Sequence, residues 1–519
     1  MKRVLTIYTR HCKPTAIKIR FELFMFKKIL NNFIYKLKRE ILLIGPFRRL
    51  SFYFLEKKLY QDIIEKKDPS WISYNFPRQA REDNFYITRA IMRSIDRGLT
   101  KGLISKQVWR KAFDFAGAHL PKKIEGVKSV FIKKYRVKPP ALLAISITKQ
   151  CNLKCLGCYA DSSQIIREKL PFEIISRIVK QQKQLWGSHF TVITGGEPFL
   201  YNDNGKTILD LAAEHPDTFF LIYTNGTLIN EETAKKIASL GNITPAISVE
   251  GFEKETDERR GLGVHQKILR TFEALKKVGV LFGISITPTR QNAELILSDE
   301  FIDYYFEKCG AAYAWVLQYT PVGRSPDLNL MVTPEQRIKM FRRVWQIIRE
   351  KQLPVIDFWN CGTAIGGCIS AGRPQVGYFH INWRGDITPC VFKPYFSQNI
   401  IEVYKNGGDL NSVLFSDFFK KIRQWQNEYV IQKPTDKMGN TIACCPARDH
   451  YETIYPLLCK ADVKPIDELA KKALKNKDLR QGLINYGKKF KTLSGEIWDK
   501  EYLAPERKSG FNQNGAADD

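Results

Sequence analysis

Long hydrophobic runs are absent from the 519-residue chain, in which no stretch of eighteen consecutive apolar residues occurs. A transmembrane helix needs about 20 such residues, so the sequence predicts no membrane-spanning segment. A secretory signal is also absent, because Arg10 and Lys13 interrupt the apolar run after Lys2 and Arg3 and no small-residue cleavage site follows. We therefore expect a cytoplasmic protein.

Cysteine is scarce, with 11 residues in the whole chain. The number is odd and the distribution is uneven, which does not fit the paired framework of a disulfide-rich secreted protein. A reducing compartment is the better expectation, and clustered thiols there favour metal or redox chemistry. Two cysteines, Cys12 and Cys309, are isolated and are expected to be structural.

Acidic residues are also few, since 54 Asp and Glu stand against 82 Lys and Arg, for a formal net charge of +28. This excess predicts attraction to an anionic partner, without distinguishing nucleic acid, a phospholipid surface or an acidic substrate. The hydrophobic share of 44% and the charged share of 26% are those of an ordinary globular protein. The length is sufficient for two or three domains, each with its own core.

The positive charge is concentrated in the first sixty residues, which hold fifteen Lys and Arg against three Asp and Glu. Between Phe26 and Ile41 apolar residues recur at helical spacing and basic residues occupy the opposite arc, which predicts a basic amphipathic helix. Such a helix either lies on the inner face of an anionic membrane as a peripheral contact, or packs on the protein's own core. A nucleic-acid-binding arm is the weakest alternative, because no nucleic-acid-binding motif accompanies the charge.

From Leu59 to Lys138 the pattern is mostly helical, and two prolines then end it before a short apolar strand. Apolar β-rich runs afterwards alternate with helical segments, which predicts βα units around a parallel sheet. Six strands are counted, too few for an eight-stranded barrel. In parallel βα folds the chemistry collects at the C-terminal ends of the strands. Those ends carry Cys151, Gly195, Gly196, Glu197, Thr224, Asn225, Glu250 and the segment from Thr287 to Arg290.

Cys151, Cys155 and Cys158 have the spacing C-x3-C-x2-C on the loop after the first predicted strand. Thiolates gathered in this way bind zinc or an iron–sulfur cluster. A structural zinc site needs a fourth protein ligand, and no further Cys or His lies close by in the sequence. Three thiolates on a four-iron cluster leave one iron open for a substrate. We therefore favour an iron–sulfur cluster over zinc.

This loop and the motif TGGEP that begins at Thr194 resemble the radical S-adenosylmethionine (SAM) superfamily over residues 142–324. The resemblance implies an α/β fold with a partial (β/α)6 TIM-like barrel, in which the three cysteines hold a [4Fe–4S] cluster. It also implies that Gly195, Gly196 and Glu197 bind the methionyl amino group of SAM. One electron, supplied by a donor such as ferredoxin or flavodoxin, cleaves SAM to a 5′-deoxyadenosyl radical. That radical abstracts hydrogen from an unactivated C–H bond under anaerobic conditions.

Further cofactor contacts are implied by position in the motif. Ser248 and Glu250 lie on the fourth strand, where relatives often place a polar residue against the ribose. Many relatives have an aromatic residue directly before the third cysteine, whereas this chain has Gly157 there and Tyr159 just after it. Tyr159 is therefore the candidate for contact with the adenine, and no catalytic residue is assigned.

A second group of cysteines lies in the C-terminal part. Cys368, Gly385 and Cys390 follow the order cysteine, strand, glycine turn, strand, cysteine, which resembles the SPASM and twitch extensions of the same superfamily. The resemblance implies a small α+β domain with one auxiliary iron–sulfur cluster, for which Cys368, Cys390 and Cys445 are the candidate ligands. The fourth ligand is Cys361, Cys444 or Cys459, or the fourth position is open. Buried free thiols around a hairpin are the alternative.

The expected organisation is a basic N-terminal segment (1–60), a helical adaptor (61–138), the radical SAM barrel (139–325), an auxiliary-cluster domain (326–460) and a charged helical C-terminal segment with a disordered tail (461–519). The motifs do not specify the substrate. The basic N-terminus favours a membrane lipid chain, whose C–H bonds are unactivated. The alternative hypotheses are maturation of a peptide or protein, and a non-catalytic iron–sulfur scaffold.

Overall fold

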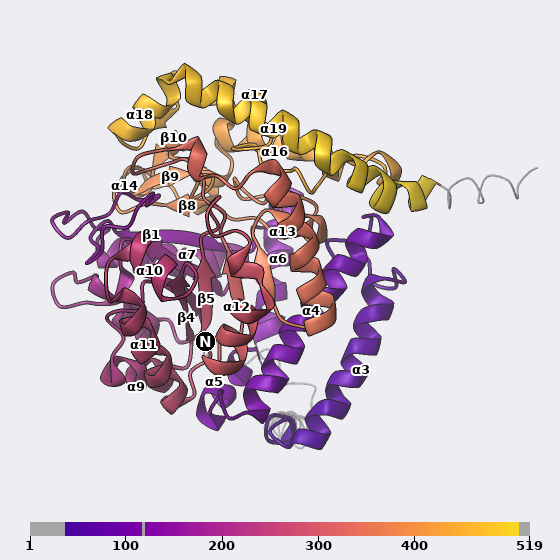
Figure 1. The fold of residues 1–519 in the computed structure, drawn as a ribbon, viewed down its shortest axis with the longest axis vertical. Helices are drawn as coiled ribbons and strands as arrows, with labels where there is room; N and C mark the ends of the chain where they lie inside the picture. Colours follow the sequence, from indigo (N-terminus) through magenta and orange to yellow (C-terminus); the bar gives the residue numbers. More distant parts are fainter. Residues whose placement is uncertain (1–36, 117–119, 508–519) are drawn as a thin grey trace, which may run out of the picture.

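The computed structural model of the chain describes residues 37–116 and 120–507 (Figure 1). The helix predicted between Phe26 and Ile41 lies outside these ranges, apart from residues 37–41. The predicted disordered tail also lies outside the described residues. Among the helices that are described, none combines the length and the apolar character needed to cross a bilayer.

Seven parallel strands form the wall of a partial barrel, and each strand pairs with the next one in the chain. They are β1 (Leu143–Thr148), β2 (Phe190–Gly195), β3 (Phe219–Thr224), β4 (Ile243–Val249), β5 (Gly283–Ile286), β6 (Ala314–Val316) and β7 (Val355–Asp357). The α/β class and the partial barrel are therefore confirmed. Six of the strands coincide with the apolar runs in the sequence, whereas β7 is an addition whose three residues are too few to show a periodic pattern.

Helices between the strands cover the outside of the barrel (Figure 1). They are α7 (Phe172–Trp186), α8 (Ile208–Glu214), α9 (Glu231–Leu240), α10 (Glu253–Arg260), α11 (Val264–Val278), α12 (Asp299–Asp303) and α13 (Pro334–Gln346). Local sequence sets their ends, as α9 illustrates. The side chain of Asn230 caps the first turn of α9 by accepting a hydrogen bond from the Thr233 N–H, and Gly241 ends the helix in the left-handed conformation with φ of 70°.

The C-terminal region extends the barrel sheet to ten strands. Strand β8 (His380–Ile381) pairs in parallel with β1 and turns back through Gly385 into the antiparallel β9 (Asp386–Thr388), which pairs with β11 (Gln398–Asn399). A two-stranded sheet of β10 (Tyr395–Phe396) and β12 (Lys464–Pro465) lies apart from it. The strand, glycine turn and strand predicted from the sequence thus share one continuous sheet with the barrel.

The described N-terminal residues form four helices, namely α3 (Gly45–Ile63), α4 (Arg78–Thr100), α5 (Lys106–Ala116) and α6 (Leu120–Tyr135). Helix α4 lies between the barrel and α3, which stands at the edge of the molecule (Figure 1). Hydrogen bonds hold α4 to the end of the barrel, where Asn84 donates to the Ala364 carbonyl and Arg89 donates to the Arg349 carbonyl.

The remaining helices belong to the C-terminal region, and α17, α18 and α19 run along its outer edge at the top of the view (Figure 1). They are α14 (Ile400–Lys405), α15 (Leu410–Leu414), α16 (Asp417–Gln426), α17 (Tyr451–Leu458), α18 (Glu468–Lys475) and α19 (Lys477–Ile497). The mixed charge of the last two helices predicted a solvated face. One side of α19 nevertheless buries Leu483 and Phe490, because it packs against α13.

A fully buried ion pair joins α13 to the C-terminal region. The guanidinium of Arg337 donates to both carboxylate oxygens of Asp449, and both side chains are 0% exposed. The same guanidinium lies over the ring of Phe490, 3.7 Å from its centroid. A carboxylate oxygen of Asp449 also accepts the backbone N–H of Cys445 at 3.0 Å. The pair therefore connects the barrel, α19 and the loop that carries the C-terminal thiols.

Candidate active site

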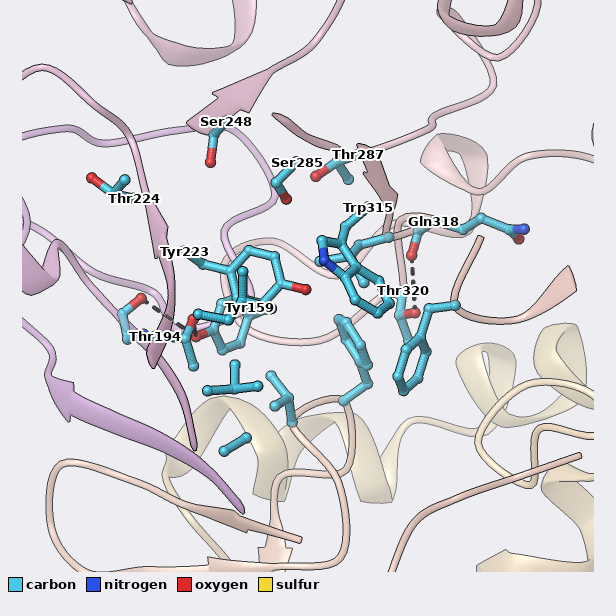
Figure 2. Close-up of a pocket in the computed structure, with 18 of the residues that line it drawn as sticks. Tyr159, Thr194, Tyr223, Thr224, Ser248, Ser285, Thr287, Trp315, Gln318 and Thr320 are labelled. Carbon is cyan, nitrogen blue, oxygen red and sulfur yellow. Dashed lines mark hydrogen bonds between the residues drawn. The ribbon is translucent and has the colours of Figure 1, made fainter. Parts of the chain in front are cut away.

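A cavity of about 460 Å³ occupies the interior of the barrel. Its wall is mainly aliphatic and aromatic, and the strands contribute Val192, Leu221, Tyr223, Trp315 and Ile356 to it. The polar side chains in the wall include Thr194, Thr224, Ser248, Ser285, Thr287 and Gln318 (Figure 2). An apolar chamber with a few oriented polar groups is typical of a site for an organic ligand or substrate.

The three cysteines of the loop after β1 all line this cavity. Cys151 is buried, and its Sγ accepts the Leu153 N–H at 3.4 Å and the side-chain amide of Asn225 at 3.8 Å. Burial raises the pKa of the Cys151 thiol to about 12 and also raises the pKa of the Cys155 thiol. A cationic metal centre is what would stabilise these groups as thiolates. Within residues 37–116 and 120–507, no group of three or more His, Cys, Asp or Glu is arranged around the position of a single metal ion.

The glycine pair at the end of β2 lies directly against the cysteine loop. Gly196 donates its N–H to the Thr148 carbonyl at 2.7 Å, and Glu197 donates its N–H to the Gln150 carbonyl at 2.8 Å. A Cβ atom on Gly196 would lie only 2.0 Å from the Gln150 carbonyl oxygen. Side chains are therefore excluded at this contact, and the backbone of the glycine pair is exposed to the cavity beside the thiols.

We expect Gly196→Ala to push the cysteine loop away from β2. The clash should lower the free energy of unfolding by about 3 kcal/mol. Alkylation of Cys151 by iodoacetamide should become faster in the folded protein, because the thiol loses its burial. Gly495→Ala is the matched control, because a Cβ there meets no atom within 4 Å, and α19 should gain up to about 1 kcal/mol. Equal alkylation rates in Gly196→Ala and the unaltered protein would contradict the contact.

Glu197 is fully buried and does not line the cavity. Its carboxylate accepts hydrogen bonds from the Phe199 N–H, from the Thr224 hydroxyl at 2.7 Å and from the Asn225 N–H at 2.8 Å. Burial raises the pKa of this carboxyl, while these hydrogen bonds oppose the rise. The side chain therefore fixes Asn225 beside Cys151, and its oxygens are directed at β3 instead of the cavity.

Tyr159 and Ser248, which the sequence analysis gave as candidate cofactor contacts, both line the cavity. The Tyr159 hydroxyl lies 2.9 Å from the Thr194 hydroxyl and accepts the Gly195 N–H at 3.1 Å (Figure 2). The ring thus spans from the cysteine loop to the end of β2. Ser248 lies on β4 on the opposite side of the cavity (Figure 2).

Two arginines of α10 contribute to the site and were not predicted from the sequence. Arg259 and Arg260 line the cavity, and both form ion pairs with Glu250, which is 1% exposed. The Arg260 Nη1 also lies 4.0 Å from the Cys155 Sγ. Glu250 therefore turns toward the arginines and does not itself line the cavity. The sequence feature that could have identified them is a pair of adjacent arginines at the end of the helix that follows β4.

Arg324 holds the cysteine loop from the other side. Its guanidinium donates to the carbonyls of Cys155 and Ser162 and forms an ion pair with Asp161 at 3.0 Å. Arg324 is not among the site residues predicted from the sequence. Ser162 lines the cavity, and its buried hydroxyl has no hydrogen-bond partner among the described residues. An unpartnered polar group next to three thiols fits a site built for a bound cofactor.

Four further thiols surround a smaller cavity of about 30 Å³ in the C-terminal region. They are Cys368, Cys390, Cys444 and Cys445. Of the three residues considered for the fourth position, only Cys444 lies here. Cys361 lines the barrel cavity, and Cys459 is exposed at the end of α17. Burial raises the pKa of the Cys445 thiol to about 12.

The groups around these four thiols fit an anionic cluster. Arg448 is fully buried at the cavity wall, and its Nε and Nη1 have no hydrogen-bond partner within the described residues. Gln426 directs its side-chain amide to the Cys368 Sγ at 3.6 Å, and the Tyr378 hydroxyl donates to the Cys390 Sγ at 3.1 Å. A buried cation with free donors, beside four thiols that can ionise, is the charge arrangement that an iron–sulfur cluster needs.

The two cavities share one wall. Phe358, Tyr378 and Phe392 line both of them, together with Thr320, Ile365 and Ile369. The shared rings are in contact, since the centroids of Phe358 and Phe392 are 6.1 Å apart. A wall that includes three aromatic side chains therefore separates the barrel interior from the C-terminal thiols.

A partial parallel barrel with three thiols beside a glycine pair at its C-terminal rim defines a cluster-dependent redox enzyme. Residues 145–296 of the chain match the model of the radical SAM superfamily. Its members are enzymes that use a [4Fe–4S] cluster and SAM, so these are cofactors of this protein. They also require a reductant.

Several named proteins are similar to this chain over about half of its length or more. AdoMet-dependent heme synthase from Oleidesulfovibrio alaskensis is 27% identical over 48% of this chain and 69% of its own length. Mycofactocin maturase MftC from Mycolicibacterium smegmatis is 26% identical over 56% of this chain and 74% of its own. The crystal structure of Streptococcus suis SuiB bound to S-adenosylmethionine aligns with a TM-score of 0.47 and 20% identity, over 62% of this chain and 76% of that one.

Proposed function

We propose that this enzyme abstracts a hydrogen atom from an unactivated C–H bond in the apolar part of a substrate enclosed by the barrel. One observation supports this most directly: the three thiols, the glycine pair and the apolar interior line one continuous cavity. Enclosure by apolar walls keeps water and competing hydrogen donors away from a reactive radical. The hydroxyl groups in the wall are few enough to orient a substrate without solvating it.

In this proposal Cys151, Cys155 and Cys158 hold the [4Fe–4S] cluster, which together with SAM supplies the hydrogen-abstracting radical. Gly195 and Gly196 present their backbone to the methionyl group, as their exposure to the cavity beside the thiols allows. Tyr159 and Ser248 contact the nucleoside from opposite sides of the same chamber.

Glu197 and Glu250 act as positioning residues behind the cavity wall. Glu197 holds Asn225 against Cys151, and Glu250 holds Arg260 near Cys155. A guanidinium at this place is suited to the carboxylate of SAM.

The C-terminal thiols are proposed to hold one auxiliary cluster, with Cys444 as the fourth ligand beside the candidates Cys368, Cys390 and Cys445. The shared aromatic wall places such a cluster close to the substrate chamber. It could accept an electron from a substrate radical across that wall. A ferredoxin- or flavodoxin-type protein is the predicted donor of electrons to the enzyme.

Tyr378→Phe tests this second cluster. The substitution removes the hydroxyl that donates to the Cys390 Sγ but keeps the ring in the wall. A hydrogen bond to a cluster sulfur favours the reduced state, so the potential should fall, by about 60 mV for each 1.4 kcal/mol lost. Redox titration monitored by electron paramagnetic resonance measures this. Tyr395→Phe is the control, since its hydroxyl donates to the Ala470 carbonyl and not to a thiol. An unchanged potential at unchanged iron content would contradict the assignment.

Two substrate classes follow from different observations. The names of the relatives, which include mycofactocin maturase and sporulation killing factor maturation protein SkfB, favour maturation of a peptide or protein over modification of a membrane lipid. The apolar wall of the cavity fits either an aliphatic side chain of a peptide or the hydrocarbon chain of a lipid. We place peptide or protein maturation first, and a lipid chain second.

Deuterium transfer distinguishes the two classes. The enzyme is reconstituted anaerobically, reduced and supplied with SAM and with either the peptide or the lipid fraction of cells grown on deuterated medium. Deuterium should enter 5′-deoxyadenosine with the fraction that contains the substrate. Transfer from peptide alone supports maturation, and transfer from lipid alone reverses the order of the two classes. No 5′-deoxyadenosine at full cluster content, with or without either fraction, would overturn the proposed activity.

A further inference from the structure

Helix α3 exposes a continuous apolar stripe, which we call the α3 outer face. It consists of Ile44, Phe47, Leu50, Phe54 and Leu55, whose exposures range from 43% to 60%. The opposite side of the helix buries Phe52, Leu59 and Ile63 against α4. The helix is therefore apolar on both sides, although only one side is covered by protein.

This exposure is concentrated in one place. Fifteen large apolar residues are exposed in the described part of the chain, and eight of them fall between Leu37 and Tyr60. The others, such as Leu262 and Ile165, are scattered singly over the surface. Scattered apolar residues are ordinary, whereas a contiguous stripe marks an interaction site.

The charges around the stripe are positive. Arg49, Lys57 and Lys58 are exposed on α3, and the Lys58 side chain remains 70% exposed although it pairs with Asp62. The carboxylate Glu56 is turned inward to Arg89 and Arg93 of α4. An apolar helix face with exposed cations beside it is the arrangement of helices that lie in the surface of an anionic bilayer.

The barrel cavity extends to α4, the helix on which α3 packs. Ile87 and Ile91 of α4 line the cavity, and Ile91 is 47% exposed. They lie with Ile356 of β7 and Leu142, which precedes β1, so α4 covers the gap between the last and first parallel strands. Helix α3 packs on the same helix, α4.

We propose that the α3 outer face docks on an anionic phospholipid bilayer, with its apolar stripe among the acyl chains and its cations at the phosphates. The positive charge of this face favours a bilayer over two other occupants, namely a second copy of the chain and the segment that precedes α3. A second copy of α3 would bring Arg49 and Lys57 against their own equivalents. The segment before α3 is also basic, with nine Lys and Arg and one Glu in residues 1–36.

Flotation of the full chain with vesicles tests the docking. Vesicles of phosphatidylcholine with phosphatidylglycerol should capture the protein, and pure phosphatidylcholine should capture much less of it. The variant Phe47→Ser, Leu50→Ser, Phe54→Ser should lose about 100-fold in partition, because each inserted side chain contributes up to about tenfold. The variant Val130→Ser, Ile165→Ser, Leu262→Ser is the matched control, since it removes three exposed apolar side chains elsewhere and should partition as the unaltered protein does.

Circular dichroism establishes that both triple variants fold. Equal partition of the folded α3 variant and the unaltered chain would overturn the proposal. It would also be overturned if the chain formed dimers in the absence of lipid that only the α3 variant lost, because a second copy would then occupy the face. Vesicle capture is measured without SAM or reductant, so its failure is separable from a failure of the proposed radical chemistry.

Discussion

Replacing Cys155 with alanine is expected to abolish turnover of SAM. The three thiols of the loop share one cavity wall, and a cluster held by only two of them has lost one of its ligands. Formation of 5′-deoxyadenosine should fall by at least about 1,000-fold, since the whole activity depends on this centre. Anaerobic reconstitution followed by iron analysis should show a loss of four irons per chain, with any iron at the C-terminal thiols retained.

Cys309→Ala provides the matched control. Cys309 is also buried, but it lies near Tyr304 and lines neither of the two thiol cavities. This variant should keep its iron and its activity, at a modest cost in stability from the small cavity. Full iron content and activity in the Cys155→Ala protein would contradict the assignment of the loop.

Arg337→Ala is expected to unfold the interface between the barrel and the C-terminal region. The substitution leaves the Asp449 carboxylate buried without its cation and removes the guanidinium stacked on Phe490. Loss of one partner of a buried pair costs about 3–5 kcal/mol, and denaturant unfolding under anaerobic conditions should show this decrease. The Cys445 loop should be affected as well, because Asp449 accepts its N–H.

An exposed pair on the same helix is the control. Arg342 of α13 pairs with Glu501, and the two side chains are 49% and 42% exposed. Arg342→Ala should therefore lower the free energy of unfolding by less than about 1 kcal/mol. Similar losses in Arg337→Ala and Arg342→Ala would show that burial of the first pair does not matter to stability.

The primary site was accessible from sequence because it is local. Cys151, Cys155 and Cys158 lie within eight residues, and Gly195 and Gly196 follow the next strand. Adjacent parallel strands bring their C-terminal ends together, so chain order alone predicts that the two motifs meet. The two motifs meet where the Gly196 N–H donates a hydrogen bond to the Thr148 carbonyl.

The second thiol site shows where sequence reasoning becomes incomplete. The hairpin of β8 and β9 relates Cys368 to Cys390, and the glycine turn at Gly385 indicated it. No spacing rule chooses among distant residues for the remaining positions, because loop closure over fifty residues is compatible with many partners. The fold brings Cys444 to the same cavity as Cys368, Cys390 and Cys445, whereas Cys361 lines the barrel cavity.

The direction in which a side chain points also depends on the tertiary structure. Glu197 and Glu250 follow the strands as predicted, yet their carboxylates turn to Asn225 and to the arginines of α10. A buried carboxylate has to pair with nearby hydrogen-bond donors or cations. Those groups come from segments whose positions around the carboxylate cannot be predicted from the sequence.

The sequence by itself determined the alternation of strands and helices, the loop of three thiols and the glycine pair, because each depends on periodicity or spacing over a few residues. Only the tertiary structure decided the short strand β7, the fourth C-terminal thiol, the shared aromatic wall and the uncovered side of α3. Those features depend on which distant surfaces pack together, and packing is settled by shape and burial across the whole chain.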